Sequence, residues 1–344
     1  MAFYKLNTKI ITTKGLKLIQ DLSEKDYVFD TFSNPVKISK IIHYSGKINN
    51  VISNRKNNIY LRDCDSLFLK KTTTNRFKED TVNISLNMYS KQFRTFKHVY
   101  KLYITPLELR ENEIDIDPYF LGLLLGDGNM KYSNIGITTM DKEIIDEIYN
   151  QANKLNLKIR ITGIINSKAS TYHFSDKFRH MNNELMNMIK SNDLYGKSSG
   201  DKFIPNSYLF NGKQNRLSVL AGLLDTDGSK GRDNNYDYIS KSKQLANDIT
   251  FLSRTLGFRA TMTECKKGCQ TGAVGTYYRV SICCNENIIP VRLERKKSQP
   301  RKQKKNVRVF GFNIEETFGD FIGLSVGGDN TYINNECFVV CGAM

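Results

Sequence analysis

Two short apolar runs, each closed by an aspartate and a glycine, constrain this chain more than any other feature. They are FLGLLLGDG at 120–128 and LAGLLDTDG at 220–228, and their final acids, Asp127 and Asp227, lie 100 residues apart. Wound as helices, both runs are apolar on almost every side, which predicts that both helices are buried.

Small residues in each run indicate that the two helices pack against each other. Gly122 in the first run, and Ala221 and Gly222 in the second, allow two backbones to approach closely. Gly128 and Gly228 are expected to end the helices, as glycine commonly does just past a helix end. The two acids would then meet at the tips of a helix pair.

The sequence after each run repeats the same order of elements. Helical periodicity is present at Lys142–Leu157 and again at Lys243–Phe258, and strand-like segments flank both, at 135–139, 171–175 and 277–282. Two copies of such a unit predict one domain with a pseudo-twofold axis. The polar and aromatic side chains of the strands fit either a nucleic-acid-reading sheet or an ordinary half-buried one.

Two adjacent carboxylates at the negative ends of two helix dipoles repel each other. A divalent cation would relieve this repulsion, with the carboxylates of Asp127 and Asp227 and the carbonyls of Gly126 and Thr226 as hard oxygen ligands. Mg²⁺ is the expected ion, with Mn²⁺ as the alternative, and such a site suits phosphodiester hydrolysis. A single Asp-Gly would more simply be a helix end and a turn.

The composition limits the class of molecule that this chain is expected to bind. The chain has 344 residues, enough for two domains, a formal net charge of +16 and 25% charged residues. This charge favours nucleic acid or an anionic membrane, and the alternative is a general lysine enrichment set by codon composition. No apolar run approaches the roughly 20 residues that span a bilayer, and the start is unlike a signal peptide. We therefore expect an intracellular protein without a membrane partner, nuclear if its source is eukaryotic.

LAGLLDTDG resembles the LAGLIDADG signature of homing endonucleases at seven of nine letters, and FLGLLLGDG resembles its looser forms. The resemblance implies a monomeric enzyme that cuts a long asymmetric site in double-stranded DNA. It also implies that Asp127 and Asp227 are the catalytic, metal-binding acids. Leu125 stands where the signature has its earlier acid, a departure expected to matter little.

The same resemblance implies a lysine near each half of the site. Lys202 lies in DKFIPNSYL just before the second run, and Lys297 lies in RKKSQP with Lys296 beside it. We expect Lys202 and Lys297 to stabilise charge on the phosphoryl group or to position water. The alternative for both is a plain phosphate contact.

The stretch at 292–306 carries eight basic residues and one acid. It is predicted to follow a DNA backbone, although a solvated linker would have the same composition. The residues expected to contact DNA are Arg292, Arg295, Lys296, Arg301, Lys302, Arg279 and Lys241.

The flanking zones, 1–108 and 305–344, read as short strands and resemble the Hint fold of inteins. The predicted fold is α+β: an all-β, split Hint domain with an inserted αββαββα-type LAGLIDADG domain at 109–304. Its halves are placed at about 109–205 and 206–304. Host protein segments, the exteins, would flank such an element.

The splice junctions depart from the Hint pattern. Ala2 stands at the position of the Cys or Ser nucleophile, Ala343 at that of the terminal Asn, and Asp65 where an assisting His is expected. Neither junction would then be cleaved by the usual chemistry. Alanine at both positions indicates deliberate inactivation, with natural loss as the alternative.

The seven cysteines do not suggest a disulfide scaffold. A zinc site from Cys265, Cys269, Cys283 and Cys284 has poor ligand spacing, so reduced thiols are preferred.

Two functions compete with the nuclease: a splicing element whose endonuclease has decayed, and a maturase-like RNA- or DNA-binding module. The pair of acids and lysines argues against simple binding. The sequence leaves the role of residues 72–108 open.

Overall fold

A computed structural model describes the chain in nine stretches: 2–55, 57–72, 81–164, 167–176, 183–231, 235–268, 274–284, 288–299 and 308–342. Contacts divide the protein into two compact units. One, the β-rich unit, consists of residues 1–108 and 306–344, and the other, the repeat unit, of residues 109–305. The division lies within one residue of the boundaries expected from the sequence.

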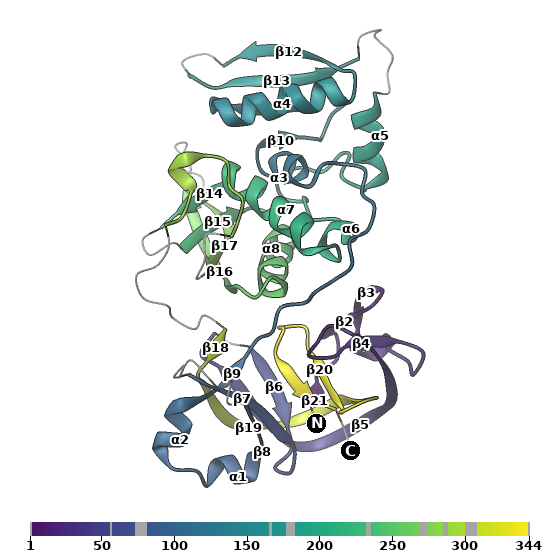
Figure 1. The fold of residues 1–344 in the computed structure, drawn as a ribbon, viewed down its shortest axis with the longest axis vertical. Helices are drawn as coiled ribbons and strands as arrows, with labels where there is room; N and C mark the ends of the chain where they lie inside the picture. The colour runs from purple at the N-terminus through teal and green to yellow at the C-terminus, as the bar shows by residue number, and fades with distance from the viewer. Residues whose placement is uncertain are drawn as a thin grey trace. The chain divides into compact units, whose positions relative to one another are not determined.

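The β-rich unit is built around one long antiparallel ribbon, formed by β5 (Pro35–Ser53) and β19 (Phe312–Val326) and visible as curved strands in Figure 1. The strand β19 runs through Gly319, which pairs with Gly46 on β5. Both glycines have positive φ angles, 157° and 146°, which glycine adopts readily, and the pairing continues through them.

Short strands complete the sheet in the order β19-β1-β6-β5-β4, and its core contains Phe3, Ile48 and Phe321. The added strands are β1 (Phe3–Tyr4), β4 (Tyr27–Phe29) and β6 (Asn58–Leu61).

A second sheet of the β-rich unit has the order β18-β9-β7-β8. Its members are β7 (Ser66–Lys71), β8 (Thr81–Ser85), β9 (Tyr100–Tyr103) and β18 (Val309–Phe310). Two short helices accompany it, α1 (Leu86–Ser90) and α2 (Arg94–Val99), so the unit is not all-β. Phe96 lies in α2, and its ring stacks on that of Tyr100 at the start of β9, with 4.5 Å between ring centroids.

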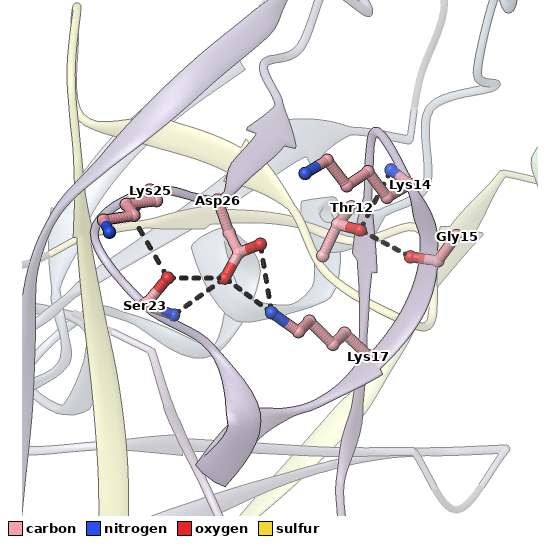
Figure 2. Close-up of polar contacts among 7 residues, drawn as sticks. All are labelled: Thr12, Lys14, Gly15, Lys17, Ser23, Lys25 and Asp26. Atoms are coloured by element: carbon pink, nitrogen blue, oxygen red, sulfur yellow. Dashed lines mark hydrogen bonds and ion pairs between the residues drawn. The ribbon is translucent and has the colours of Figure 1, made fainter.

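The smaller elements of this unit are two hairpins and a 3-10 turn: β2 (Lys9–Thr12), β3 (Gly15–Leu18), η1 (Ile19–Asp21), β20 (Thr331–Ile333) and β21 (Val339–Cys341). Figure 2 shows Asp26 joining the first hairpin to the loop before β4. Its carboxylate accepts hydrogen bonds from Lys17 Nζ at 2.9 Å and from the Ser23 N–H at 2.8 Å. Burial alone would raise the pKa of Asp26, but these donors hold it below its ordinary value.

The repeat unit contains the predicted order of elements twice. The first copy runs α3 (Pro118–Asp127), β10 (Gly128–Asn129), β11 (Gly136–Thr139), α4 (Lys142–Lys154), β12 (Lys158–Gly163), β13 (Ser170–Ser175) and α5 (Glu184–Ser191). The second runs α7 (Lys213–Thr226), β14 (Gly228–Lys230), β15 (Asn235–Ser240), α8 (Lys243–Thr255), β16 (Arg259–Gly268) and β17 (Val274–Cys283). A short helix, α6 (Asn206–Leu209), joins them, and a 3-10 turn, η3 (Glu294–Lys296), follows the second.

Each copy makes one antiparallel four-stranded sheet, β10-β11-β13-β12 in the first and β14-β15-β17-β16 in the second. In Figure 1 the helices α4 and α8 lie against these sheets, and α3 and α7 lie side by side between them. The mixed α+β architecture of this unit is confirmed. None of the helices in the described residues is long and apolar enough to cross a membrane.

The predicted close approach of α3 and α7 occurs at their glycines. A Cβ added to Gly122 would lie 2.8 Å from the Gly222 Cα, and one added to Gly222 would lie 2.9 Å from the Gly122 Cα. Any side chain there would force the backbones apart. The helix pair is therefore specified by two glycines in apolar surroundings.

Gly128 and Gly228 follow the helices, but not for the reason expected. Gly128 has an extended backbone (φ −75°, ψ 139°) rather than the left-handed conformation of a typical glycine cap. A Cβ on Gly128 or on Gly228 would lie 2.6 Å from the Cα of Leu124 or Leu224 on the preceding helix. Glycine is needed because the chain turns back tightly over the helix end.

Candidate active site

The two acids lie at the ends of the central helix pair. Asp127 is the last residue of α3 and Asp227 directly follows α7. Both are exposed at the surface, while the helices behind them are buried. Surrounding protein displaces water from Asp127, and this desolvation, with the charge of Asp227, raises the pKa of Asp127 to about 6. Desolvation likewise raises the pKa of Asp227. The structure thus brings the predicted pair into one electrostatic environment.

The side chain of Lys202 extends to the end of α3, close to Asp127. Its ammonium donates hydrogen bonds to three carbonyl oxygens at the end of α3: Leu124 at 3.1 Å, Gly126 at 2.9 Å and Gly128 at 2.8 Å. Burial lowers the pKa of Lys202 to about 8, although Asp227 and Asp127 oppose this shift. Lys202 is therefore a cap on the helix that carries Asp127.

Lys296, not Lys297, occupies the equivalent place in the second half. Its ammonium donates at 2.8 Å to each of the carbonyl oxygens of Leu224, Asp225 and Thr226. Lys296 is 8% exposed, whereas Lys297 points to solvent and pairs with Glu294 at 2.7 Å. The choice of Lys297 from the sequence is corrected: the 3-10 turn η3 directs its neighbour inward.

Two carbonyl oxygens predicted as metal ligands also contact the capping lysines. Those of Gly126 and Thr226 each accept a hydrogen bond from a lysine ammonium, but a carbonyl oxygen has a second lone pair, so their role as metal ligands stays a prediction. The other candidate ligands are the two carboxylates. Desolvation raises the pKa of both carboxyl groups, so their charged forms are costly there; a divalent cation would stabilise these charged forms, and the two residues fit a metal.

Tyr238 adds a group that the sequence interpretation missed. Its hydroxyl lies 3.5 Å from Asp227 Oδ2, and burial raises its pKa well above the ordinary value. Tyr238 lies opposite Gly228 in the sheet, and Ile137 takes that place opposite Gly128. The two halves of the site are therefore chemically unequal.

Asp225, the earlier acid of the second run, is buried at 1% exposure and serves another purpose. It accepts hydrogen bonds from the Tyr119 hydroxyl at 2.9 Å, the Arg292 N–H at 2.6 Å and the Leu293 N–H at 3.3 Å. It thereby holds the segment that leads to Lys296. Leu125, at the corresponding place in the first run, has no such polar side chain.

Of the residues expected to contact DNA, three make polar contacts with other residues of the protein. Arg292 pairs with Glu147 at 2.6 Å, Arg295 pairs with Asp141 at 2.5 Å, and Lys296 caps α7. Arg279 on β17 and Lys241 after β15 are exposed, as DNA contacts would require. Arg301 and Lys302 lie outside the described residues.

The zinc alternative finds no support in the described residues, among which no three His, Cys, Asp or Glu side chains gather as a metal-binding group. Cys269 lies outside them, and Cys265, Cys283 and Cys284 are not in disulfides.

Comparison with known proteins identifies similarities to parts of this chain. Residues 214–292 match the model of a LAGLIDADG-like domain. A replicative DNA helicase, DnaB of Mycobacterium intracellulare, is 28% identical over 167 residues, which span 47% of this chain and 23% of the helicase. The similarity to LAGLIDADG-like domains lies in the second copy of the repeat.

Two solved structures of the homing endonuclease I-DmoI are also similar to this chain. A structure of its mesophilic variants has a TM-score of 0.34 at 17% identity and covers 48% of this chain and 87% of its own. A complex of I-DmoI with DNA and Ca has a TM-score of 0.34 at 17% identity and covers 48% of this chain and 82% of its own.

Proposed function

We propose that the repeat unit is a site-specific, divalent-cation-dependent double-strand DNA endonuclease that acts as a monomer on intracellular DNA. The observation that carries the proposal is the pair of carboxylates, Asp127 and Asp227, at two adjacent helix tips. Each tip is capped by a buried lysine, and both acids share one electrostatic environment. A binding module would have no need of such a destabilised charge pair.

Asp127 and Asp227 would hold the cation, Mg²⁺ or Mn²⁺. When bound, the cation would polarise a phosphoryl oxygen and lower the pKa of water beside it. Lys202 and Lys296 use their donors on the helix carbonyls, so their contribution is to fix the tips and to offset the negative charge there. A direct contact of either lysine with phosphate would require it to leave a carbonyl.

The two four-stranded sheets and the basic surface would provide the DNA interface. Arg279 extends from the second sheet, and Lys241 follows its strand β15. A sheet of this kind can present side chains to base edges in the major groove, while lysines and arginines contact phosphates. Because both halves lie on one chain, the proposed target is asymmetric.

The test is to incubate the protein with a randomised duplex library and Mg²⁺ and to sequence the cut ends. Wild type should yield one consensus sequence, while Asp127→Asn and Asp227→Asn should yield none. Asp146→Asn removes an exposed carboxylate from the surface of α4 and should cut like wild type. Intact duplexes with wild-type protein and Mg²⁺ would reject the proposal.

We further propose that the β-rich unit is a Hint-type protein-splicing domain that is inactive as it stands. The Ala2 N–H donates to the Cys341 carbonyl at 2.8 Å, which supports the proposal because splicing needs both junctions side by side. Asp65 is held by Arg62 at 3.0 Å, a pairing that favours its charged form. Ala343 lies outside the described residues.

The match to 23% of a DNA helicase is what an element carried inside a host protein would give. Host segments fused to both ends, with Ala2→Cys and Ala343→Asn, should yield a ligated and shorter product. A precursor that persists over days would reject the splicing proposal and leave the nuclease proposal untouched.

A further inference from the structure

We propose that Glu147 and Asp248 are a repeat-related pair of positioning residues, each of which anchors, from the opposite half, the segment carrying one capping lysine. The inference rests on the proposed nuclease function and concerns how its two half-sites are kept in place. It predicts that each half-site depends on an acid that belongs to the other half.

The two acids occupy the same position in the two copies. Each is the sixth residue of its helix, Glu147 in α4 and Asp248 in α8. Both are nearly buried, at 5% and 4% exposure, although carboxylates are rarely buried without partners. The N-cap residues of these helices, Asp141 and Ser242, correspond to each other in the same way.

In the second half, α8 holds the segment that contains Lys202. Asp248 Oδ2 accepts the Ile204 N–H at 2.9 Å, and the Ser242 hydroxyl donates to the Lys202 carbonyl at 2.6 Å. Gln244 donates to the other oxygen of Asp248 at 2.7 Å and so fixes the carboxylate. Lys202 then caps α3 of the first half.

In the first half, α4 holds the segment that contains Lys296. Glu147 Oε2 accepts a hydrogen bond from Arg292 Nη1 at 2.6 Å, and Gln151 donates to the other carboxylate oxygen of Glu147 at 2.6 Å. The two carboxylate oxygens of Asp141 accept hydrogen bonds from the two terminal guanidinium nitrogens of Arg295, at 2.5 and 2.7 Å. Lys296 then caps α7 of the second half, so the two anchors cross the pseudo-twofold axis.

The anchors are not equally strong. On the Lys296 side, Arg292 also stacks on Tyr119 at 3.7 Å from the ring centroid, and Asp225 accepts two backbone N–H groups. On the Lys202 side, Asp248 accepts the backbone N–H of Ile204 directly. This contact is more deeply buried than the Arg292–Glu147 pair, whose arginine side chain is 40% exposed. Loss of Asp248 should therefore cost more than loss of Glu147.

The experiment uses the full chain and a duplex recovered from the library, labelled differently on its two strands. Asp248→Leu should slow the cut in one strand by about tenfold, and Glu147→Leu should slow the cut in the other strand by a smaller factor, as removal of outer partners of a metal site does. Nicked intermediate should accumulate in both. Asp248→Asn keeps an acceptor oxygen and should retain most of the rate.

Asp146→Leu, beside Glu147 but exposed, is the matched control and should cut both strands at the wild-type rates. A variant that slows both strands equally, or neither, overturns the inference, since general destabilisation cannot select a strand. Amide hydrogen exchange gives a readout that needs no cleavage. Asp248→Leu should speed exchange at Ile204 and leave 292–297 unchanged, and Glu147→Leu should do the converse.

If wild-type protein cuts no duplex, the proposed function fails, and the crossed exchange pattern still decides the anchoring. Equal acceleration at both segments would refute it.

Discussion

Replacement of Lys296 by methionine tests the assignment of the second capping lysine. The ammonium of Lys296 donates three hydrogen bonds of 2.8 Å to the last carbonyls of α7 and is 8% exposed. Methionine has a similar volume and flexibility but no donor. Three carbonyls at a helix end would lose their partner at once.

The expected loss follows from these contacts. A hydrogen bond to a charged group contributes about 1.5–3 kcal/mol, and the outermost carbonyl, that of Thr226, can exchange its partner for water. Methionine also removes the cost of burying an ammonium, which the lowered pKa of Lys296 reflects. We expect a net loss of about 3 kcal/mol, and for a unit of this size about 6–12 °C in Tm.

Thermal and urea unfolding of the full chain would measure the change, with Lys297→Met as the control. Lys297 has an exposed side chain paired with an exposed Glu294, so its loss should change stability by less than about 0.5 kcal/mol. Equal small effects for both variants, or a larger one for Lys297→Met, would show that the cap is misassigned.

Three further predictions follow from other sites. Gly122→Ala places a methyl 2.8 Å from the Gly222 Cα and should destabilise the repeat unit by about 3 kcal/mol in urea unfolding. Gly163→Ala, whose methyl meets no atom of the described residues within 4 Å, should not. The pKa of Asp127 is raised to about 6, so without metal this group makes the fold less stable as pH rises from about 4 through 6. Mg²⁺ binding, followed by calorimetry, should weaken below about pH 6 as protons compete. Asp26→Asn should cost about 1–3 kcal/mol at neutral pH. Because the folded pKa of Asp26 is lowered, its stabilisation is present above about pH 4, and the difference between variant and wild type should vanish as pH falls through the folded pKa.

The helix pair and the repeat could be predicted because a few residues determine them. An apolar run that is buried on all sides, with glycine at the contact, has few packing solutions, and Gly122 and Gly222 meet as expected. Helix ends were less predictable. The periodicity at Lys142–Leu157 continues past Lys154, but Asn156 adopts a left-handed φ of 54° and ends α4 early.

The capping lysine could not be chosen from the sequence for a physical reason. Lys296 and Lys297 are adjacent, have the same chemistry, and differ only in the direction that η3 gives them. Composition likewise shows the charge of Arg292 and Arg295 but not their partners. The residues that pair with them, Glu147 in α4 and Asp141 at its N-cap, are far away in the sequence.

The earlier acid of the second run has no counterpart in the first run, yet the segments of both capping lysines are held in place. Asp225 points away from the helix tips and binds the backbone of the segment before Lys296, which a carboxylate can do and Leu125 cannot. In the first copy the segment around Lys202 gains an equivalent hold from Asp248, whose carboxylate binds the Ile204 N–H. Each lysine segment thus has one buried carboxylate on its backbone, supplied from a different element. The segment around Lys202 is thus held without an acid at position 125, and the first run, with Leu125, still places Asp127 where the charge of Asp227 raises its pKa.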